Sequence, residues 1–335
     1  MMFRSAKRAT VFAAVLASAA LVTAACSSQG GAQNSGAANA PAGGTAPGGQ
    51  KYTIAMVTHA PPGDTFWDKI QSGAQAAATQ LGVDLKYSND PDSGPQATLV
   101  QNAIDSKVDA IAVSLAYPDA VGPVLKKASD AGIPTVAFNA GLDQYQKYGA
   151  KMYFGSDEDV AGQAVGTRLS RSGGTGKAIC VIQEQGNVAL ETRCAGVAKT
   201  YPNVEILQVN GRDLPSVQQT IGAKLQEDPS IGYVVTLGAD YALAAAQSVS
   251  SGNSQAKIAT FDLNKDTAQA IKDGKVLFAV DQQPYLQGFM SVQMLWLNLT
   301  NGNDLGGGKA VLTGPSYVDS ANIDKILQFA NNNTR

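Results

Sequence analysis

From residue 51 onward, short apolar segments alternate with longer amphipathic ones, and this alternation limits the possible folds more than any other feature. Alternating β and α units of this size favour an α/β fold with parallel sheets and helices on both sheet faces. The predicted strands span residues 52–57, 83–87, 110–113, 134–138, 152–154, 178–182, 204–208, 233–237, 257–261 and 277–280. The predicted helices span residues 67–81, 95–107, 120–131, 159–171, 190–200, 216–227, 241–249, 267–273 and 285–300.

A glycine-rich break at residues 172–176 interrupts the alternation, which then restarts. The segment from residue 51 to residue 335 is longer than a single hydrophobic core usually serves. We therefore expect two similar Rossmann-like lobes. In open parallel sheets of this kind, ligands bind at the carboxyl ends of the strands.

The N-terminal segment has the pattern of an export signal. Basic residues at positions 4, 7 and 8 precede an apolar stretch at residues 11–22, which is too short to span a bilayer. Ala24, Ala25 and Cys26 follow, and the whole resembles a bacterial lipoprotein signal peptide over residues 1–25, with Cys26 as the lipidated residue. The alternative is an ordinary secretory cleavage site near Ala25. No later segment is apolar and long enough for a transmembrane helix.

Apart from Cys26, residues 26–50 contain only Gly, Ala, Ser, Gln, Asn, Thr and Pro, with no charged or aromatic side chain. Such a composition cannot bury enough apolar surface to offset the entropy of ordering, so it predicts a flexible tether. The formal net charge of −2 disfavours nucleic acid as a partner, because the chain lacks a basic stripe for phosphates.

Besides Cys26, only Cys180 and Cys194 are present, together with a single histidine. This set is too small for a typical metal site, and we expect neither a metal nor a cofactor. In an exported chain the two cysteines are candidates for one disulfide bond, because one lies in a predicted strand and the other in the following helix. Two buried free thiols are the alternative.

Polar and aromatic side chains gather where the predicted strands end. The candidate ligand-binding residues are Asp64, Phe66, Trp67, Ser114, Asn139, Arg193, Asp240, Asp262 and Gln282, and the same loops carry His59, Glu184, Asn187, Asp281 and Gln283. Planar carboxylate, amide and guanidinium groups can engage adjacent hydroxyl groups, and an aromatic face packs on the C–H surface of a sugar. The set therefore suits an uncharged polyhydroxylated ligand.

Several of these residues have ordinary structural explanations as well. Trp67 can be a sugar platform or a core residue, and Phe66 can be either equally well. Asp64, Asn187 and Asp240 can cap helices. Arg193 can form a surface ion pair with Glu191 or Glu184, and a loop hydrogen bond is the simpler role for His59.

The order of these motifs resembles that of the type I periplasmic binding proteins of the ribose-binding kind, over most of residues 51–335. The motifs are "VTHAPPGDTFWDKIQSGA", "GIPTVAFNAG", "YFGSDEDVAG", "ICVIQEQGNVALETRCAG", "IATFDLN" and "VDQQPYLQG". The resemblance implies ligand contacts at Asp64, Phe66, Trp67, Arg193, Asp262 and Gln282. Asn139 and Ala140 stand where many members carry Asp-Arg, and Ala239 replaces a usual Asn beside Asp240. These departures disfavour ribose and leave another pentose, a hexose, an inositol or an open-chain polyol.

The resemblance also implies a hinge of three chain crossings, near residues 154–156, 282–284 and 314–317. The N-terminal lobe would contain residues 51–155 and 283–313, and the C-terminal lobe residues 156–282 and 314–335. The implied protein is a monomeric, extracytoplasmic, lipid-anchored solute-binding protein of a carbohydrate ABC importer. It would deliver a neutral sugar or polyol to a membrane permease driven by a cytoplasmic ATPase.

Three alternatives use the same fold or residues. A signalling or chemotaxis component would share the ligand site but dock on another partner. A glycosidase would use Asp64 and Asp262 as its carboxylate pair, although the chain lacks GxSxG, HExxH and P-loop motifs. A repressor of the lactose kind would need an N-terminal DNA-binding segment where this chain has a signal and a tether.

Overall fold

A computed structural model describes residues 51–173 and 176–335. The predicted signal peptide, the lipidation site Cys26 and the tether lie outside the described residues. Within the described part, no helix has both the length and the apolar character needed to cross a membrane.

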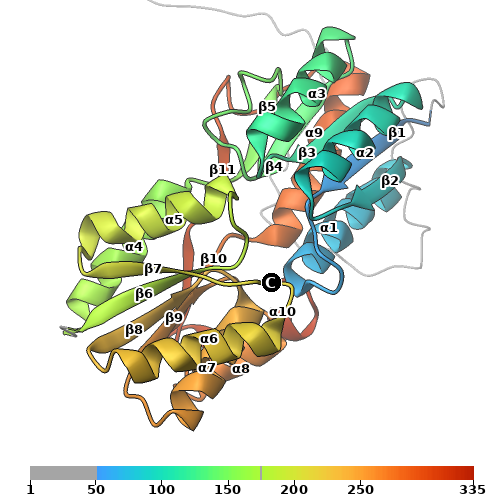
Figure 1. Cartoon of the computed structure of the whole chain (residues 1–335). Helices are drawn as coiled ribbons and strands as arrows, with labels where there is room; N and C mark the ends of the chain where they lie inside the picture. The colour runs from blue at the N-terminus through green and yellow to red at the C-terminus, as the bar shows by residue number, and fades with distance from the viewer. Residues whose placement is uncertain (1–50, 174–175) are drawn as a thin grey trace, which may run out of the picture. The chain divides into compact units, whose positions relative to one another are not determined.

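Two six-stranded sheets form the framework, and the α/β prediction is confirmed (Figure 1). The first sheet has the order β11-β5-β4-β3-β1-β2, and the second has the order β12-β10-β9-β8-β6-β7. The strands of the first sheet are β1 (Thr53–Thr58), β2 (Asp84–Asn89), β3 (Ala110–Ser114), β4 (Thr135–Asn139), β5 (Met152–Ser156) and β11 (Val311–Gly314). Those of the second are β6 (Lys177–Ile182), β7 (Val204–Gln208), β8 (Ile231–Thr236), β9 (Lys257–Phe261), β10 (Phe278–Asp281) and β12 (Ser316–Asp319).

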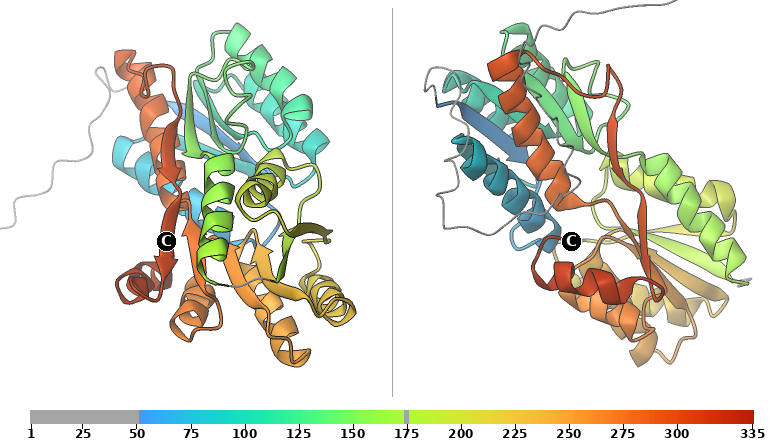
Figure 2. Two further views of the ribbon diagram at one scale, coloured as in Figure 1. Left: turned by 90° about the vertical axis from the view of Figure 1, so that its left-hand side faces the viewer. Right: turned by 180° about the vertical axis from the view of Figure 1, so that it is seen from behind.

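The two sheets repeat one topology, because the first five strands of each follow the same spatial order. All pairings are parallel except that of β12 with β10. The chain passes between the sheets after β5, after β10, and between β11 and β12. The last passage is visible in Figure 2 as the red ribbon that joins both sheets. Strands β11 and β12 and helix α10 were not predicted from the sequence.

Ten helices of the described chain cover the sheets. They are α1 (Thr65–Leu81), α2 (Ser93–Asp105), α3 (Pro118–Asp130), α4 (Glu158–Arg171), α5 (Val188–Thr200), α6 (Leu214–Glu227), α7 (Ala239–Ser251), α8 (Lys265–Lys272), α9 (Pro284–Asn301) and α10 (Ile323–Asn331).

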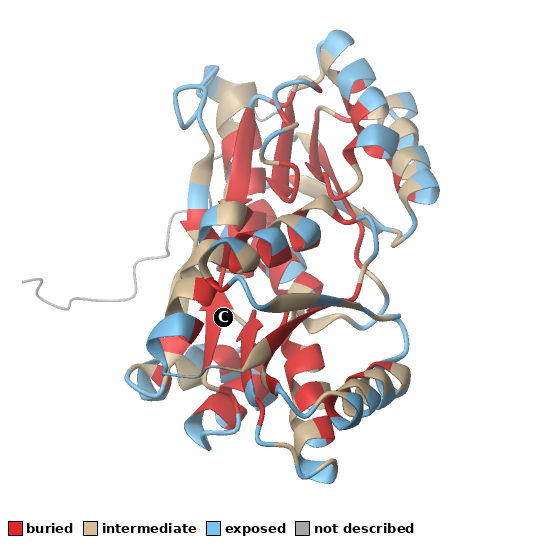
Figure 3. Ribbon diagram, turned by 60° about the vertical axis from the view of Figure 1, so that its left-hand side comes forward, coloured by how far each residue is buried: buried red, intermediate tan, exposed pale blue. Residues whose placement is uncertain are grey.

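The inner strands of both sheets are buried on both faces, and the alternation along β1 shows why. Ile54 and Met56 belong to the core cluster that includes α1 and α9, whereas Ala55 and Val57 belong to the cluster that includes α2 and α3. Successive strand residues point to opposite faces, so each strand serves two helical layers and reads as a continuous apolar run. Figure 3 shows the buried strands between the partly exposed helices.

Helices α1 and α9 approach each other at two glycines. A Cβ atom on Gly73 would lie 2.0 Å from the carbonyl oxygen of Tyr285, and one on Gly288 would lie 2.0 Å from that of Ile70. Only glycine permits this backbone contact. The contact packs the middle of α1 against α9, and the N-terminal turn of α1 reaches the site described below.

A disulfide bond joins Cys180 of β6 to Cys194 of α5, with Cα atoms 5.8 Å apart. Both residues are buried in the cluster beneath α4 and α5. The bond therefore ties α5, which carries Arg193, to β6, an inner strand of the second sheet.

Replacing both cysteines with alanine should lower the free energy of unfolding by about 3 kcal/mol, because the loop between them no longer restricts the unfolded chain. Denaturant titration under oxidising conditions measures this difference. Wild-type protein under reducing conditions is the control and should approach the variant. Equal stabilities of the oxidised wild type and the variant would contradict the prediction.

Candidate ligand-binding site

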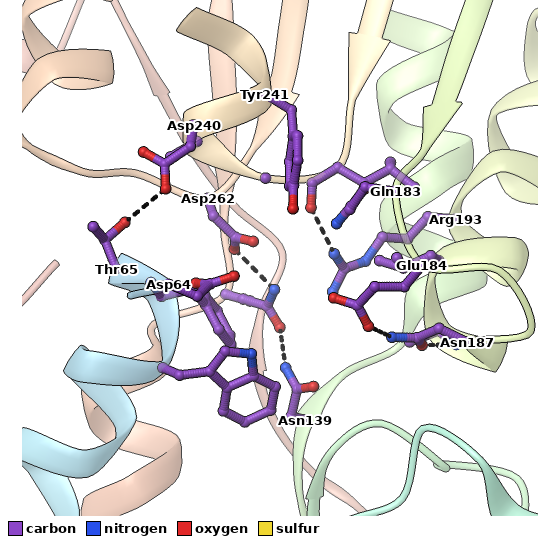
Figure 4. Close-up of a pocket in the computed structure, with 18 of the residues that line it drawn as sticks. Asp64, Thr65, Asn139, Gln183, Glu184, Asn187, Arg193, Asp240, Tyr241 and Asp262 are labelled. Atoms are coloured by element: carbon purple, nitrogen blue, oxygen red, sulfur yellow. Dashed lines mark hydrogen bonds between the residues drawn. The ribbon is translucent and has the colours of Figure 1, made fainter. Parts of the chain in front are cut away.

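One pocket receives residues from the carboxyl ends of both sheets (Figure 4). Its cavity volume is about 50 Å³, within about 520 Å³ of space that includes open solvent. That cavity has room for a few water molecules, so a ring-shaped ligand requires the sheets or the side chains to move apart. The lining residues are His59, Asp64, Thr65, Phe66, Trp67, Asn139, Gln183, Glu184, Asn187, Ala189, Leu190, Arg193, Leu237, Gly238, Ala239, Asp240, Tyr241, Asp262 and Gln282.

The structure brings together eight of the nine candidate residues named from the sequence, and Ser114 is the exception. Ser114 is fully buried and does not line the pocket. Its Oγ lies 2.7 Å from Nδ1 of His59 and accepts a hydrogen bond from the His59 backbone N–H at 3.1 Å. Ser114 therefore supports His59 from behind, and the structure does not place it among the pocket residues.

Trp67 combines the two roles that the sequence left open. The indole is buried in the core cluster under α1 and α9 and also lines the pocket. Its ring meets His59 edge-on at 4.6 Å between centroids and Phe66 edge-on at 5.3 Å. Phe66 is half-buried and also lines the pocket. These edge contacts hold the indole in one orientation beside the cavity.

Asp64 likewise caps a helix and lines the pocket. Its Oδ1 accepts the backbone N–H of Phe66 at 2.8 Å, which starts α1 at Thr65, two residues earlier than predicted. Burial raises the pKa of Asp64 to about 6, although the Phe66 hydrogen bond opposes the shift. The side chain of Asp64 thus caps α1 through Oδ1 while it lines the pocket.

A chain of three polar side chains crosses from the first sheet to the second. Asn139 Nδ2 donates to Gln282 Oε1 at 3.3 Å, and Gln282 Nε2 donates to Asp262 Oδ1 at 2.8 Å. Asn139 ends β4, and Asp262 follows β9. Both have φ of 66°, a left-handed conformation that costs energy outside glycine. The backbone is thus strained where these side chains turn into the pocket.

Arg193 lines the pocket but is already paired. Its Nε and Nη2 donate to the two carboxylate oxygens of Glu158 at 2.5 and 3.0 Å, and its guanidinium lies 4.7 Å from the Phe261 ring centroid. Burial alone would lower the pKa of Arg193, but the Glu158 carboxylate outweighs it and raises that pKa. The surface ion pair with Glu191 or Glu184 does not form, because the side chain is buried on Glu158.

The second sheet contributes further acidic groups. Asp240 accepts hydrogen bonds from Thr65 Oγ1 at 3.4 Å, across the pocket, and from Asn264 Nδ2 at 2.6 Å. Glu184 accepts one from Asn187 Nδ2 at 2.7 Å. Burial raises the pKa of Asp240, and it raises that of Glu184 to about 7. Both carboxyl groups line the pocket and can accept hydrogen bonds from a ligand there.

The two sides of the pocket touch each other. Val188 N donates to Ala116 O at 3.1 Å, and Asn187 Nδ2 lies 3.4 Å from His59 Nε2. Arg212 Nη2 donates to Asp92 Oδ1 at 2.5 Å further out. Each bond joins a residue on the first-sheet side to one on the second-sheet side, so this arrangement is a closed one.

Sequence reasoning missed several pocket residues. The sequence does not single out Thr65, Gln183 and Tyr241. Each is adjacent to a polar residue that was already named for the same loop. Lys69 does not line the pocket, yet its buried Nζ donates to Thr65 O at 2.9 Å. Burial lowers the pKa of Lys69, and nearby carboxylates, including Asp262 and Asp64, oppose that shift.

The ionisation of Asp262 should make the stability of the ligand-free protein depend on pH. Burial raises the pKa of this carboxyl group from 3.8 to about 7, with Arg193 opposing the shift and Asp281 and Glu158 adding to it. Between these values the folded protein retains a proton that the unfolded chain has released. Stability should therefore fall as pH rises through this interval, by on the order of 4 kcal/mol in total.

An Asp262→Asn variant isolates this contribution, because the amide does not titrate. Denaturant titrations of both proteins across the interval should show the variant becoming progressively more stable than wild type as pH rises. A stability difference that does not change with pH would contradict the assignment.

A pocket at the carboxyl ends of two repeated α/β sheets, closed by contacts from both sides, defines the class of two-lobed solute-binding proteins. The sequence profile of the family described as "Periplasmic binding protein domain" matches residues 54–304, and the chain belongs to this family. Its members are extracytoplasmic substrate-binding proteins of transporters and not enzymes, so the glycosidase and repressor alternatives are excluded.

Relatives with known names and structures agree with this family. A carbohydrate transporter from Acidothermus cellulolyticus, solved in complex with myo-inositol, is 53% identical with a TM-score of 0.84, over 85% of this chain and 100% of that one. The xylose/arabinose-binding protein XylF of Sulfolobus acidocaldarius is 25% identical over 82% of this chain and 73% of its own length. A xylitol-binding protein of Mycolicibacterium smegmatis is 25% identical over 79% of this chain and 76% of its own.

Proposed function

We propose that the protein is the extracytoplasmic solute-binding component of a carbohydrate ABC importer and binds a neutral sugar or polyol between its two lobes. The observation that carries the proposal is the hydrogen-bonded chain Asn139–Gln282–Asp262, which joins both sheets inside one pocket. The relative solved with myo-inositol shares 53% of its sequence and favours a cyclic polyol. Relatives named as ribose import binding proteins favour transport over signalling.

In this proposal the ligand-binding residues are Asp64, Phe66, Trp67, Asn139, Arg193, Asp240, Asp262 and Gln282. Asp64, Asp240 and Asp262 supply carboxyl oxygens to the pocket, whereas Glu158 already occupies two N–H groups of Arg193. A ligand rich in hydroxyl donors fits such a set. Hydrogen bonds to charged groups contribute about 1.5–3 kcal/mol each, so a few carboxylate contacts suffice for tight binding.

The lobes are residues 51–155 with 283–313, and residues 156–282 with 314–335. The three chain passages between them are the hinge. A ligand that contacts both lobes makes more contacts in the closed form and so shifts the population toward it. Closure presents a combined surface of both lobes, which a membrane permease with its cytoplasmic ATPase would recognise.

The N-terminal features complete the proposal. Residues 1–25 are a lipoprotein signal peptide, Cys26 carries the lipid, and residues 26–50 are a flexible tether. The monomeric protein would thus be held at the outer face of the cell membrane, which raises its effective concentration near the permease.

A thermal-shift screen of the chain from residue 26 tests the substrate class. Ligand in large excess over the dissociation constant stabilises the folded state by several kcal/mol, so a true ligand raises the melting temperature. We expect the largest rise among neutral cyclic polyols and sugars, with myo-inositol as the first compound. A rise only with amino acids or purines would refute the substrate class.

A further inference from the structure

A second cavity, of about 580 Å³, lies beside the ligand pocket and also has walls from both sheets. The two cavities share Gln183, Glu184 and Tyr241 as a common wall. The second cavity is much larger than the first, which has room for only a few water molecules. A ligand in the first pocket has a neighbouring space on the far side of three polar side chains.

The lining of this second cavity includes an aromatic ring and several carboxamide groups. Tyr117 is half-buried and offers an aromatic ring, which His59 contacts edge-on at 6.0 Å between centroids. Gln208 and Asn210 supply carboxamide groups from the end of β7 and the loop after it. An aromatic face with amide donors and acceptors is the combination that packs on a sugar ring and bonds its hydroxyls.

The shared wall also contains an unsatisfied acceptor. Gln183 is nine-tenths buried, and its Oε1 has no hydrogen-bond partner among the described residues. A buried acceptor without a partner is unfavourable, and a hydrogen-bond donor between the two cavities would satisfy it. Tyr241 is held in place beside it, because its hydroxyl donates to Gly211 O at 3.2 Å.

The charges at this cavity disfavour an anionic occupant. Its cation, Arg212, is paired with Asp92 across the rim at 2.5 Å, and Glu184 stands in the shared wall. A phosphate or carboxylate substituent would meet a carboxylate on either side without a free cation to offset it. A neutral, hydroxylated substituent meets only hydrogen-bonding groups.

We propose that this cavity is a subsite for a second sugar ring, joined by a glycosidic bond to the polyol or sugar in the first pocket. The proposal rests on the proposed function and deepens it, because it extends the substrate class from free polyols to their glycosides. Tyr117 stacks on the second ring, Gln208 bonds its hydroxyls, and Gln183 accepts a hydrogen bond at the junction.

Calorimetric titration with two ligands tests the subsite: myo-inositol and 1-O-galactosyl-myo-inositol. We expect the galactoside to bind wild-type protein at least as tightly as free myo-inositol. Tyr117→Ala should lower the affinity for the galactoside about 10-fold and leave the affinity for myo-inositol unchanged. Tyr117→Phe should bind the galactoside with the affinity of the wild type. Gln208→Ala should act in the same direction, whereas Gln219→Ala, at an exposed position of α6 outside both cavities, should change neither ligand.

The outcomes separate this inference from the proposed function. Binding of myo-inositol without the galactoside, or an equal loss of both in Tyr117→Ala, overturns the subsite and leaves the proposed function standing. Failure of both ligands and of every other neutral sugar overturns the proposed function, and the subsite with it.

Discussion

Replacement of Asp262 with alanine should reduce the affinity for a neutral polyol by about 10- to 150-fold. One hydrogen bond to a charged group contributes about 1.5–3 kcal/mol, and each 1.4 kcal/mol is a factor of ten in affinity. Asp262 also accepts a hydrogen bond from Gln282 and so orients it. The Oε1 atom of Gln282 in turn accepts a hydrogen bond from Asn139 of the first sheet. The variant therefore loses a ligand acceptor and the bond that orders its neighbour. Calorimetric titration with the ligand identified by the thermal-shift screen measures the loss.

Asp266→Ala is the matched control, because this aspartate is exposed on α8 and does not line the pocket. It should bind the ligand with unchanged affinity. If Asp262→Ala binds within about two-fold of wild type, Asp262 does not contact the ligand, because even a neutral hydrogen bond contributes more.

Replacement of Glu158 with alanine should lower the free energy of unfolding of the ligand-free protein by about 3–5 kcal/mol. The carboxylate accepts two hydrogen bonds from Arg193, and both side chains are almost completely buried. Removing one partner of a buried ion pair leaves the other charge without compensation. Denaturant titration without ligand measures the loss.

Two controls show whether the effect comes from the buried charge. Asp159→Ala removes the next acidic residue, which pairs with Lys199 at the surface, and should change stability little. Glu158→Gln keeps the volume and one acceptor and should be less damaging than alanine. A Glu158→Ala variant as stable as Asp159→Ala would show that Arg193 finds another partner or is solvated.

The sequence predicts the fold well because β/α alternation has few solutions. Strands β1, β3, β4 and β5 of the first sheet are buried on both faces, so each appears as a short apolar run between amphipathic segments. The carboxyl ends of parallel strands then collect the loops, which is why the sequence alone suffices to group Asp64, Asn139 and Asp262. The C-terminal strands β11 and β12 are four residues each and only partly buried, so neither appears as an apolar run.

The rest of the site depends on distances that the sequence does not contain. Glu158 and Arg193 are 35 positions apart on different helices, and no local pattern relates them. Ser114 ends its strand as Asn139 does, yet the His59 backbone lies over it and closes it off from the pocket. Asn139, Asp262 and Gln283 adopt left-handed φ values that local propensity disfavours. Local sequence preferences do not predict these backbone conformations, because the surrounding fold imposes them at the binding site.

The most direct test of the account is a crystal structure of the protein with myo-inositol. We predict one ligand ring beside Trp67, with hydroxyl groups bonded to Asp64 or Asn139 from one lobe and to Asp262 from the other. A ring that contacts residues of one lobe alone, or that binds outside this pocket, would contradict the central claim that both halves of the protein hold one neutral molecule.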